Sequence, residues 1–138
     1  MILNIASEPT ENGIVINMPN INLNRKLKYK IAVNRVFIVF DTVPEELMSH
    51  DLILLRSNVV DRSAENPQQS IVYFECGRKN KYISHCPHSP NFYPLRLYEL
   101  AGASFDLFRL DGTELKTPVK QFFLQLEIKR NETYGWIQ

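Results

Sequence analysis

The sequence has little of several residue types on which specialised proteins depend. Its 138 residues include two cysteines and five glycines, and the formal net charge is +1. A chain of this length buries enough apolar surface to fold without disulfide or metal staples. So few glycines disfavour a Gly-rich phosphate cradle or a flexible linker. The near-neutral charge disfavours a dedicated nucleic-acid binder, which carries a strongly basic surface.

Long apolar runs and targeting segments are missing as well. The most apolar run, at 36–40, is far shorter than the ~18 residues that span a bilayer. The N-terminus has no basic region and its apolar stretch breaks at Asn4, so we expect no secretory signal. We therefore expect an intracellular product in which Cys76 and Cys86 stay reduced, and we interpret the sequon at Asn131 as a chance match.

The hydrophobic residues, 44% of the chain, exclude a disordered protein and follow the period of β-strands. From 26 to 33, lysines alternate with apolar residues, as in a strand with one wet and one buried face. The continuous run 36–40 predicts burial on both faces or a register shift at a bulge after Asn34. The segment 120–129 alternates again, which predicts that Phe122, Leu124, Leu126 and Ile128 face inward.

Turn-forming residues divide the chain into about eight expected strands. These strands are 13–18, 26–40, 51–60, 71–76, 81–86, 94–100, 104–110 and 120–129. We expect 71–76 and 81–86 to form a hairpin, and 43–48 to form one or two helical turns. The spacing predicts a single all-β domain over 1–138, an antiparallel β-sandwich with the strand count of a single jelly roll.

Residue sets that could carry catalysis are incomplete. Cys76, His85, Cys86 and His88 lack paired zinc-ligand spacing, and the neighbours His85 and Cys86 point to opposite faces of a strand. A Cys76–Cys86 disulfide is disfavoured because a turn centred between 78 and 79 leaves the two out of register. Nucleophile-elbow, P-loop and dinucleotide motifs are absent from the sequence. We expect a non-enzymatic protein without cofactor or metal; the alternative is a zinc enzyme using His85, Cys86 and His88.

Two groups of side chains suit binding. One is a basic stripe around 25–30, together with the lysines and arginine at 78–81, which could contact phosphates. Its aromatic residue Tyr29 has the parity of the core face, so we interpret the stripe as a solvated strand face rather than a nucleic-acid site. The second group could form a glycan platform, cover a core edge or fill an interface, and comprises Phe92, Tyr93, Tyr134 and Trp136.

Residues 52–74 read LILLRSNVVDRSAENPQQSIVYF and combine L-R-S, V-D-R-S and N-P-x-Q ahead of an apolar strand. This segment resembles small jelly-roll proteins of virus-like elements in animal genomes, of the Polinton or adintovirus kind, and of related insect viruses. The segments 94–100, 104–105 and 123–129 fit the same pattern. The resemblance implies a virion protein, made in the host cytoplasm or nucleus, that forms a capsid vertex, spike or cement layer. It implies a homo-oligomer, as a trimer or pentamer, that also contacts other capsid proteins.

The possible subunit-interface residues are Arg56, Asp61, Arg62, Asn66 and Trp136. The first three bracket a strand end, where charged side chains either lock a loop or meet a neighbouring subunit. The alternative is an ordinary surface ion pair worth ~0–1 kcal/mol. As an alternative function, the same sandwich would serve as a glycan- or receptor-binding module, without membrane insertion.

Overall fold

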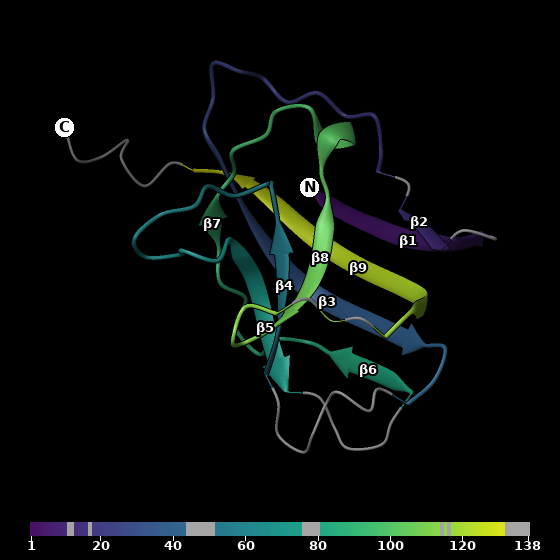
Figure 1. Cartoon of the computed structure of the whole chain (residues 1–138). Helices are drawn as coiled ribbons and strands as arrows, with labels where there is room; N and C mark the ends of the chain where they lie inside the picture. The colour runs from purple at the N-terminus through teal and green to yellow at the C-terminus, as the bar shows by residue number, and fades with distance from the viewer. Residues whose placement is uncertain are drawn as a thin grey trace.

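The computed structural model describes residues 1–10, 13–16, 18–43, 52–75, 81–113, 115 and 117–131 (Figure 1). Its elements are β1 (Ile2–Thr10), β2 (Gly13–Ile16), β3 (Tyr29–Phe40), β4 (Leu52–Ser57), β5 (Ser70–Glu75), β6 (Tyr82–His85), β7 (Tyr93–Pro94), the 3-10 helix η1 (Leu100–Gly102), β8 (Phe105–Arg109) and β9 (Val119–Arg130). The helical turns expected at 43–48 lie outside the described residues, except for Val43, which is not helical.

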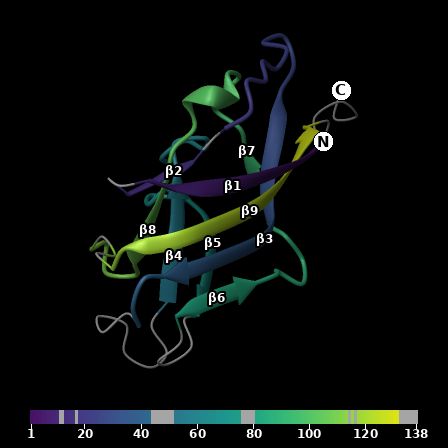
Figure 2. The same cartoon turned by 90° about the vertical axis from the view of Figure 1, so that its right-hand side faces the viewer.

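The strands form two antiparallel sheets. The larger sheet has the order β2-β1-β9-β3-β6, with β7 also paired to β3, and the smaller has the order β5-β4-β8. Figures 1 and 2 show the smaller sheet packed across one face of the larger. The prediction of an all-β antiparallel sandwich is therefore confirmed, while the jelly-roll topology stays a prediction.

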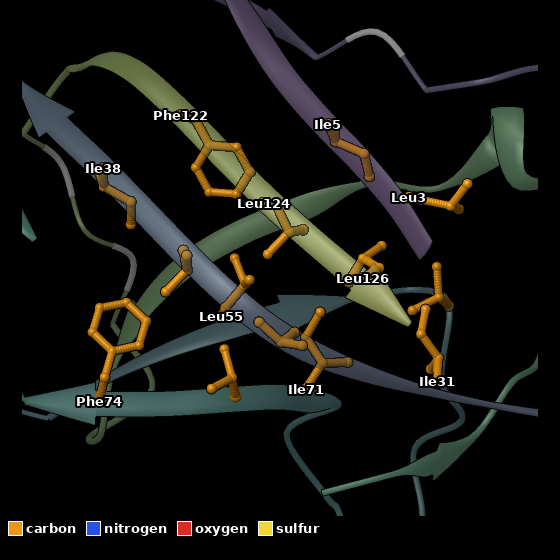
Figure 3. Close-up of a cluster of buried hydrophobic side chains, with 14 of the residues drawn as sticks. Leu3, Ile5, Ile31, Ile38, Leu55, Ile71, Phe74, Phe122, Leu124 and Leu126 are labelled. Carbon is orange, nitrogen blue, oxygen red and sulfur yellow. The ribbon is translucent and has the colours of Figure 1, made fainter. Parts of the chain in front are cut away.

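The core lies between the two sheets and is built from alternate residues of each strand (Figure 3). On β9 every second residue, from Phe122 to Ile128, is buried, and the residues between them are half-buried. This is the alternation that the sequence predicts. The smaller sheet contributes Ile53 and Leu55 from β4 to the same cluster. Burying such side chains stabilises the fold by roughly 1.5–3 kcal/mol each.

A bulge in β3 explains its continuous apolar run. Ile31 and Val33 are buried before the bulge, whereas Val36 and Ile38 are buried after it, so the buried parity changes. The pairing with β9 shifts register between Val33 and Arg35, where one strand carries an extra residue. Of the two sequence interpretations, the register shift is therefore the correct one.

The expected hairpin of 71–76 with 81–86 is wrong. β5 pairs with β4 in the smaller sheet, and β6 pairs with β3 in the larger sheet. The two strands consequently present Phe74 and Ile83 to the core from opposite layers. Because β5 extends the smaller sheet and β6 extends the larger, both layers cover the core, whereas a local hairpin would place both strands in one sheet.

Three further boundaries differ from the predictions. β1 was not expected, although Leu3 and Ile5 alternate with exposed neighbours and pack beside β9. Of the expected strand 94–100, only Pro94 belongs to β7. Leu100 instead begins η1, and its amide donates to the Ile21 carbonyl oxygen. The stretch 24–27 is a turn, so the lysine stripe does not run along one strand face.

Candidate binding site

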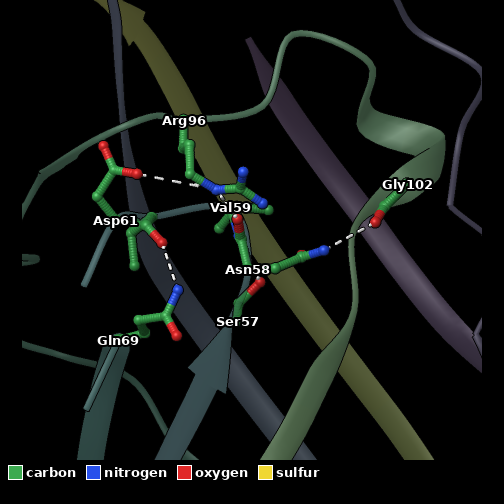
Figure 4. A network of polar contacts seen from close by, with 8 residues as sticks. Ser57, Asn58, Val59, Asp61, Gln69, Arg96 and Gly102 are labelled. Atoms are coloured by element: carbon green, nitrogen blue, oxygen red, sulfur yellow. Dashed lines mark hydrogen bonds and ion pairs between the residues drawn. The ribbon is translucent and has the colours of Figure 1, made fainter. Parts of the chain in front are cut away.

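The segment of 57–70 that joins β4 to β5, hereafter the loop corner, is held by its own polar side chains (Figure 4). The Ser57 amide donates to the Gln69 carbonyl oxygen at 3.1 Å, and the Ser57 hydroxyl oxygen accepts from the Val59 amide at 3.2 Å. The Gln69 Nε2 donates to the Val60 carbonyl oxygen at 2.9 Å. Gln69 itself has a φ of 54°, a left-handed conformation unusual for a residue with a side chain. These bonds fix the path of the chain from the end of β4 back to the start of β5.

Asn66 closes the loop corner by a double hydrogen bond. Its Nδ2 donates to the Ser70 carbonyl oxygen at 2.9 Å, and the Ser70 amide donates to its Oδ1 at 3.0 Å. The Asn66 amide in turn donates to the Ser63 hydroxyl at 3.0 Å. An asparagine before a proline is a usual turn residue, because its side chain mimics a backbone group. The structure thus gives this predicted interface residue an intramolecular role.

Asn58 and Arg96 tie the loop corner to the segment before β8. Asn58 Nδ2 donates to the Gly102 carbonyl oxygen at 3.0 Å, and its Oδ1 accepts from the Ser104 amide at 2.9 Å. Arg96 Nε donates to the Asn58 carbonyl oxygen at 2.9 Å, and the Arg96 amide donates to Val59 at 2.6 Å. Segments about forty residues apart in the chain therefore form one rigid corner (Figure 4).

Arg56 and Asp61, two of the charged residues predicted as an interface, have different partners. Arg56 lies over the ring of Phe108, with its Cζ 4.0 Å from the ring centroid. Asp61 faces Arg96 at 3.9 Å, and both side chains are largely solvent-exposed, so this pair contributes little. Arg62 is exposed. Trp136 lies outside the described residues.

A pocket of about 440 Å³ opens beside the loop corner. Residues from two sets that the sequence analysis treated separately line it together: the interface candidates Asp61 and Asn66, and the aromatic residues Phe92 and Tyr93. One wall is apolar, with Val60, Phe92, Tyr93 and Pro94. The other is polar, with Asp61, Ser63, Glu65 and Asn66. Pockets of this size with an apolar wall and a few polar groups are typical of small-ligand sites.

Charges surround the aromatic wall of this pocket. Lys30 Nζ lies 5.1 Å and Lys129 Nζ 5.0 Å from the centroid of the Phe92 ring. Burial raises the pKa of the Tyr93 hydroxyl, and the nearby Tyr73 raises it further, so Tyr93 stays neutral over the physiological range. The pocket therefore has two positive charges next to Phe92 and the carboxylates of Asp61 and Glu65 in its polar wall.

Three members of the histidine and cysteine set, His85, Cys86 and His88, lie within the described residues. His85 stacks on Phe74, with ring centroids 5.4 Å apart, and burial lowers its pKa. Cys86 is exposed and unpaired, and Cys76 lies outside the described residues. Within the described part of the chain, no three His, Cys, Asp or Glu side chains are grouped to hold a metal ion. The alternative zinc set of His85, Cys86 and His88 is therefore not assembled.

The outer face of the smaller sheet carries apolar side chains on each of its strands. In the register, Leu54 of β4 lies opposite Tyr73 of β5 and opposite Phe108 of β8. Strand alternation turns these three away from Ile53 and Leu55, which belong to the core. Tyr73 is 55% exposed, whereas Leu54 between its neighbours is 5% exposed.

No helix in the described part of the chain is long and apolar enough to cross a membrane. Comparison of the chain with protein-family models, curated proteins and solved structures found no match.

Proposed function

We propose that this protein is a non-enzymatic structural subunit of a virus or virus-derived element, and that it acts by assembling with copies of itself. It forms a jelly-roll building block of a capsid vertex, spike or cement layer, as a trimer or pentamer in contact with other capsid proteins. The residues 52–74 carry the sequence resemblance behind this proposal, and the strand order of the sandwich is the observation that supports it most.

In a jelly roll, the first, eighth, third and sixth of eight strands form one sheet, and the second, seventh, fourth and fifth form the other. When the two-residue β7 is left out of the count, β1-β9-β3-β6 has the first order. The smaller sheet, β8-β4-β5, has the second order without its first member. The departure is β2, which forms a hairpin with β1 instead of joining β8.

The residues that carry the resemblance support a structural role. Ser57, Asn58 and Asn66 direct their polar atoms into hydrogen bonds within the loop corner and its neighbouring segment. A segment that shapes a connection between strands fits a building block better than a catalyst. Closed oligomers need such defined surfaces, because one copy must present the same complementary patch to the next.

We expect the outer face of the smaller sheet to contact a second copy. Apolar side chains on the outer face of a sheet mark interaction surfaces, and here the exposed Tyr73 and the half-buried Phe108 flank the buried Leu54. These three stand beside Arg56 and Asp106, which lie opposite each other in the register and supply charges of both signs at their border. An apolar centre with a polar rim is the usual composition of a protein interface.

Light scattering coupled to size-exclusion chromatography tests this proposal. We expect the purified chain to form a discrete oligomer, and Tyr73→Glu to shift it toward the monomer while the circular dichroism spectrum is unchanged. The matched control is Tyr82→Glu on β6, because Tyr82 is 57% exposed and belongs to the other sheet. A wild-type protein that stays strictly monomeric at the highest attainable concentration would contradict the proposal.

A further inference from the structure

The pocket beside the loop corner is not needed for assembly through the smaller sheet. Its walls are held in place without a ligand. Tyr93 pairs with Ile31 of β3, and Val60 is 1% exposed and bridges to Leu95. The opposite wall is fixed by the double hydrogen bond of Asn66. A pocket built on such fixed walls loses little entropy when it binds a ligand.

The polar wall has side-chain atoms for a hydroxyl-bearing ligand. Asn66 already uses one Nδ2 proton and one Oδ1 lone pair on the Ser70 backbone, so Asp61, Glu65 and Ser63 are the main candidates. Asp61 is exposed, and its contact with Arg96 is long at 3.9 Å, so its carboxylate accepts further hydrogen bonds. Glu65 is exposed on the same wall. Ser63 accepts a bond from the Asn66 amide and keeps its own hydroxyl proton to donate.

The charges around the pocket decide which ligand class fits. The ammonium groups of Lys30 and Lys129 lie against Phe92, so a cationic ligand stacking on that ring meets like charges. The carboxylates of Asp61 and Glu65 repel an anion such as phosphate. A neutral ligand with many hydroxyl groups and one apolar face avoids both penalties.

We propose that this pocket binds a neutral pyranose sugar. The C–H face of the ring packs on the aromatic wall of Phe92 and Tyr93, and its hydroxyl groups donate to Asp61 and Glu65. The site gives an assembling subunit a second activity, attachment to glycans. Both residues belong to the glycan platform that the sequence suggests, and both line the pocket.

Saturation-transfer-difference NMR of the full chain tests the proposal with galactose, mannose and N-acetylglucosamine. The matched charged probes are glucose 6-phosphate, N-acetylneuraminic acid and putrescine, each of which carries C–H protons that the experiment detects. We expect saturation of ring C–H protons for at least one neutral sugar, with weaker or no transfer to the charged probes. A signal from none of the neutral sugars, or a stronger one from a charged probe, overturns the assignment.

Three variants locate the binding. We expect Glu65→Gln and Asp61→Asn each to weaken the sugar affinity by roughly tenfold, since each removes a charged acceptor. Glu75→Gln is the control, because Glu75 is an exposed carboxylate on β5 that does not line the pocket. Equal affinities of wild type and all three variants overturn the site. Binding by a Phe108→Glu variant at wild-type strength separates this site from assembly, because Phe108 belongs to the outer face of the smaller sheet and does not line the pocket.

Discussion

Replacing Asn66 by alanine tests how far the loop corner depends on one side chain. The substitution removes both hydrogen bonds that Asn66 makes with the Ser70 backbone, which are 2.9 and 3.0 Å long and partly buried. It leaves the Ser70 amide and carbonyl without these partners at the start of β5. The Asn66 backbone amide can still donate to Ser63, so the local turn is not lost outright.

The cost follows from those two bonds. Each intramolecular hydrogen bond contributes about 0.5–1.5 kcal/mol net, so we expect a loss of about 2 kcal/mol in the free energy of unfolding. The unfolding entropy of a domain of this length is about 0.29 kcal/mol/K near the midpoint, which converts the loss into a Tm decrease of about 7 °C. Ser70 is 8% exposed, so water replaces the lost partners poorly and the result lies at or above this figure rather than below it.

Thermal unfolding followed by circular dichroism measures the effect. Asn20→Ala is the matched control, because Asn20 is an exposed loop asparagine, and we expect its Tm to stay within about 2 °C of the wild type. If Asn66→Ala shifts the Tm no more than Asn20→Ala does, the double bond does not hold the loop corner and the reasoning is refuted.

Further predictions concern the turn before β9, the pH dependence and the core. Gly112 has a φ of 91° with open space around it, so Gly112→Ala costs about 1–2 kcal/mol from backbone strain, whereas Gly102→Ala, without positive φ, is neutral or stabilising in urea unfolding. Burial lowers the pKa of His85 from 6.5, so its neutral form contributes stability above pH 6.5 that is lost as the pH falls below it. We expect His85→Gln to flatten the fall of Tm below pH 6.5, and an unchanged slope would exclude His85 as its source. Leu124 is fully buried between the sheets, so Leu124→Ala lowers the urea-derived stability by about 2–5 kcal/mol, and a loss below 1 kcal/mol would contradict its place in the core.

The strands that sequence reasoning placed best are those whose burial follows from their own residues. The alternation through β9 and the register shift in β3 depend on which face of a strand is apolar, and the residues of the strand itself determine that face. These residues do not determine which strand becomes the partner. Both β5 and β6 carry inward apolar residues such as Phe74 and Ile83, and these suit a hairpin as well as two separate sheets. Proximity in the chain favoured the hairpin, whereas closure of the core requires the longer-range pairing.

The candidate site was partly predictable for the same reason. The stretch 52–74 stood out by its polar motif, and the Asn66-Pro67 pair could have indicated a side chain bonded to its own loop. Attention to the charged side chains instead suggested contacts between subunits. The pocket joins Asp61 to Phe92 and Tyr93 through the pairing of β7 with β3, a tertiary event that spacing in the sequence does not encode.

Native mass spectrometry of the purified chain tests the central claim, assembly into a closed oligomer, most directly. The account predicts one dominant species whose mass is a small integer multiple of the chain mass, a trimer or pentamer. We expect that species to give way to the monomer in Tyr73→Glu and to persist in Tyr82→Glu. A spectrum of monomer alone across all concentrations would contradict the account.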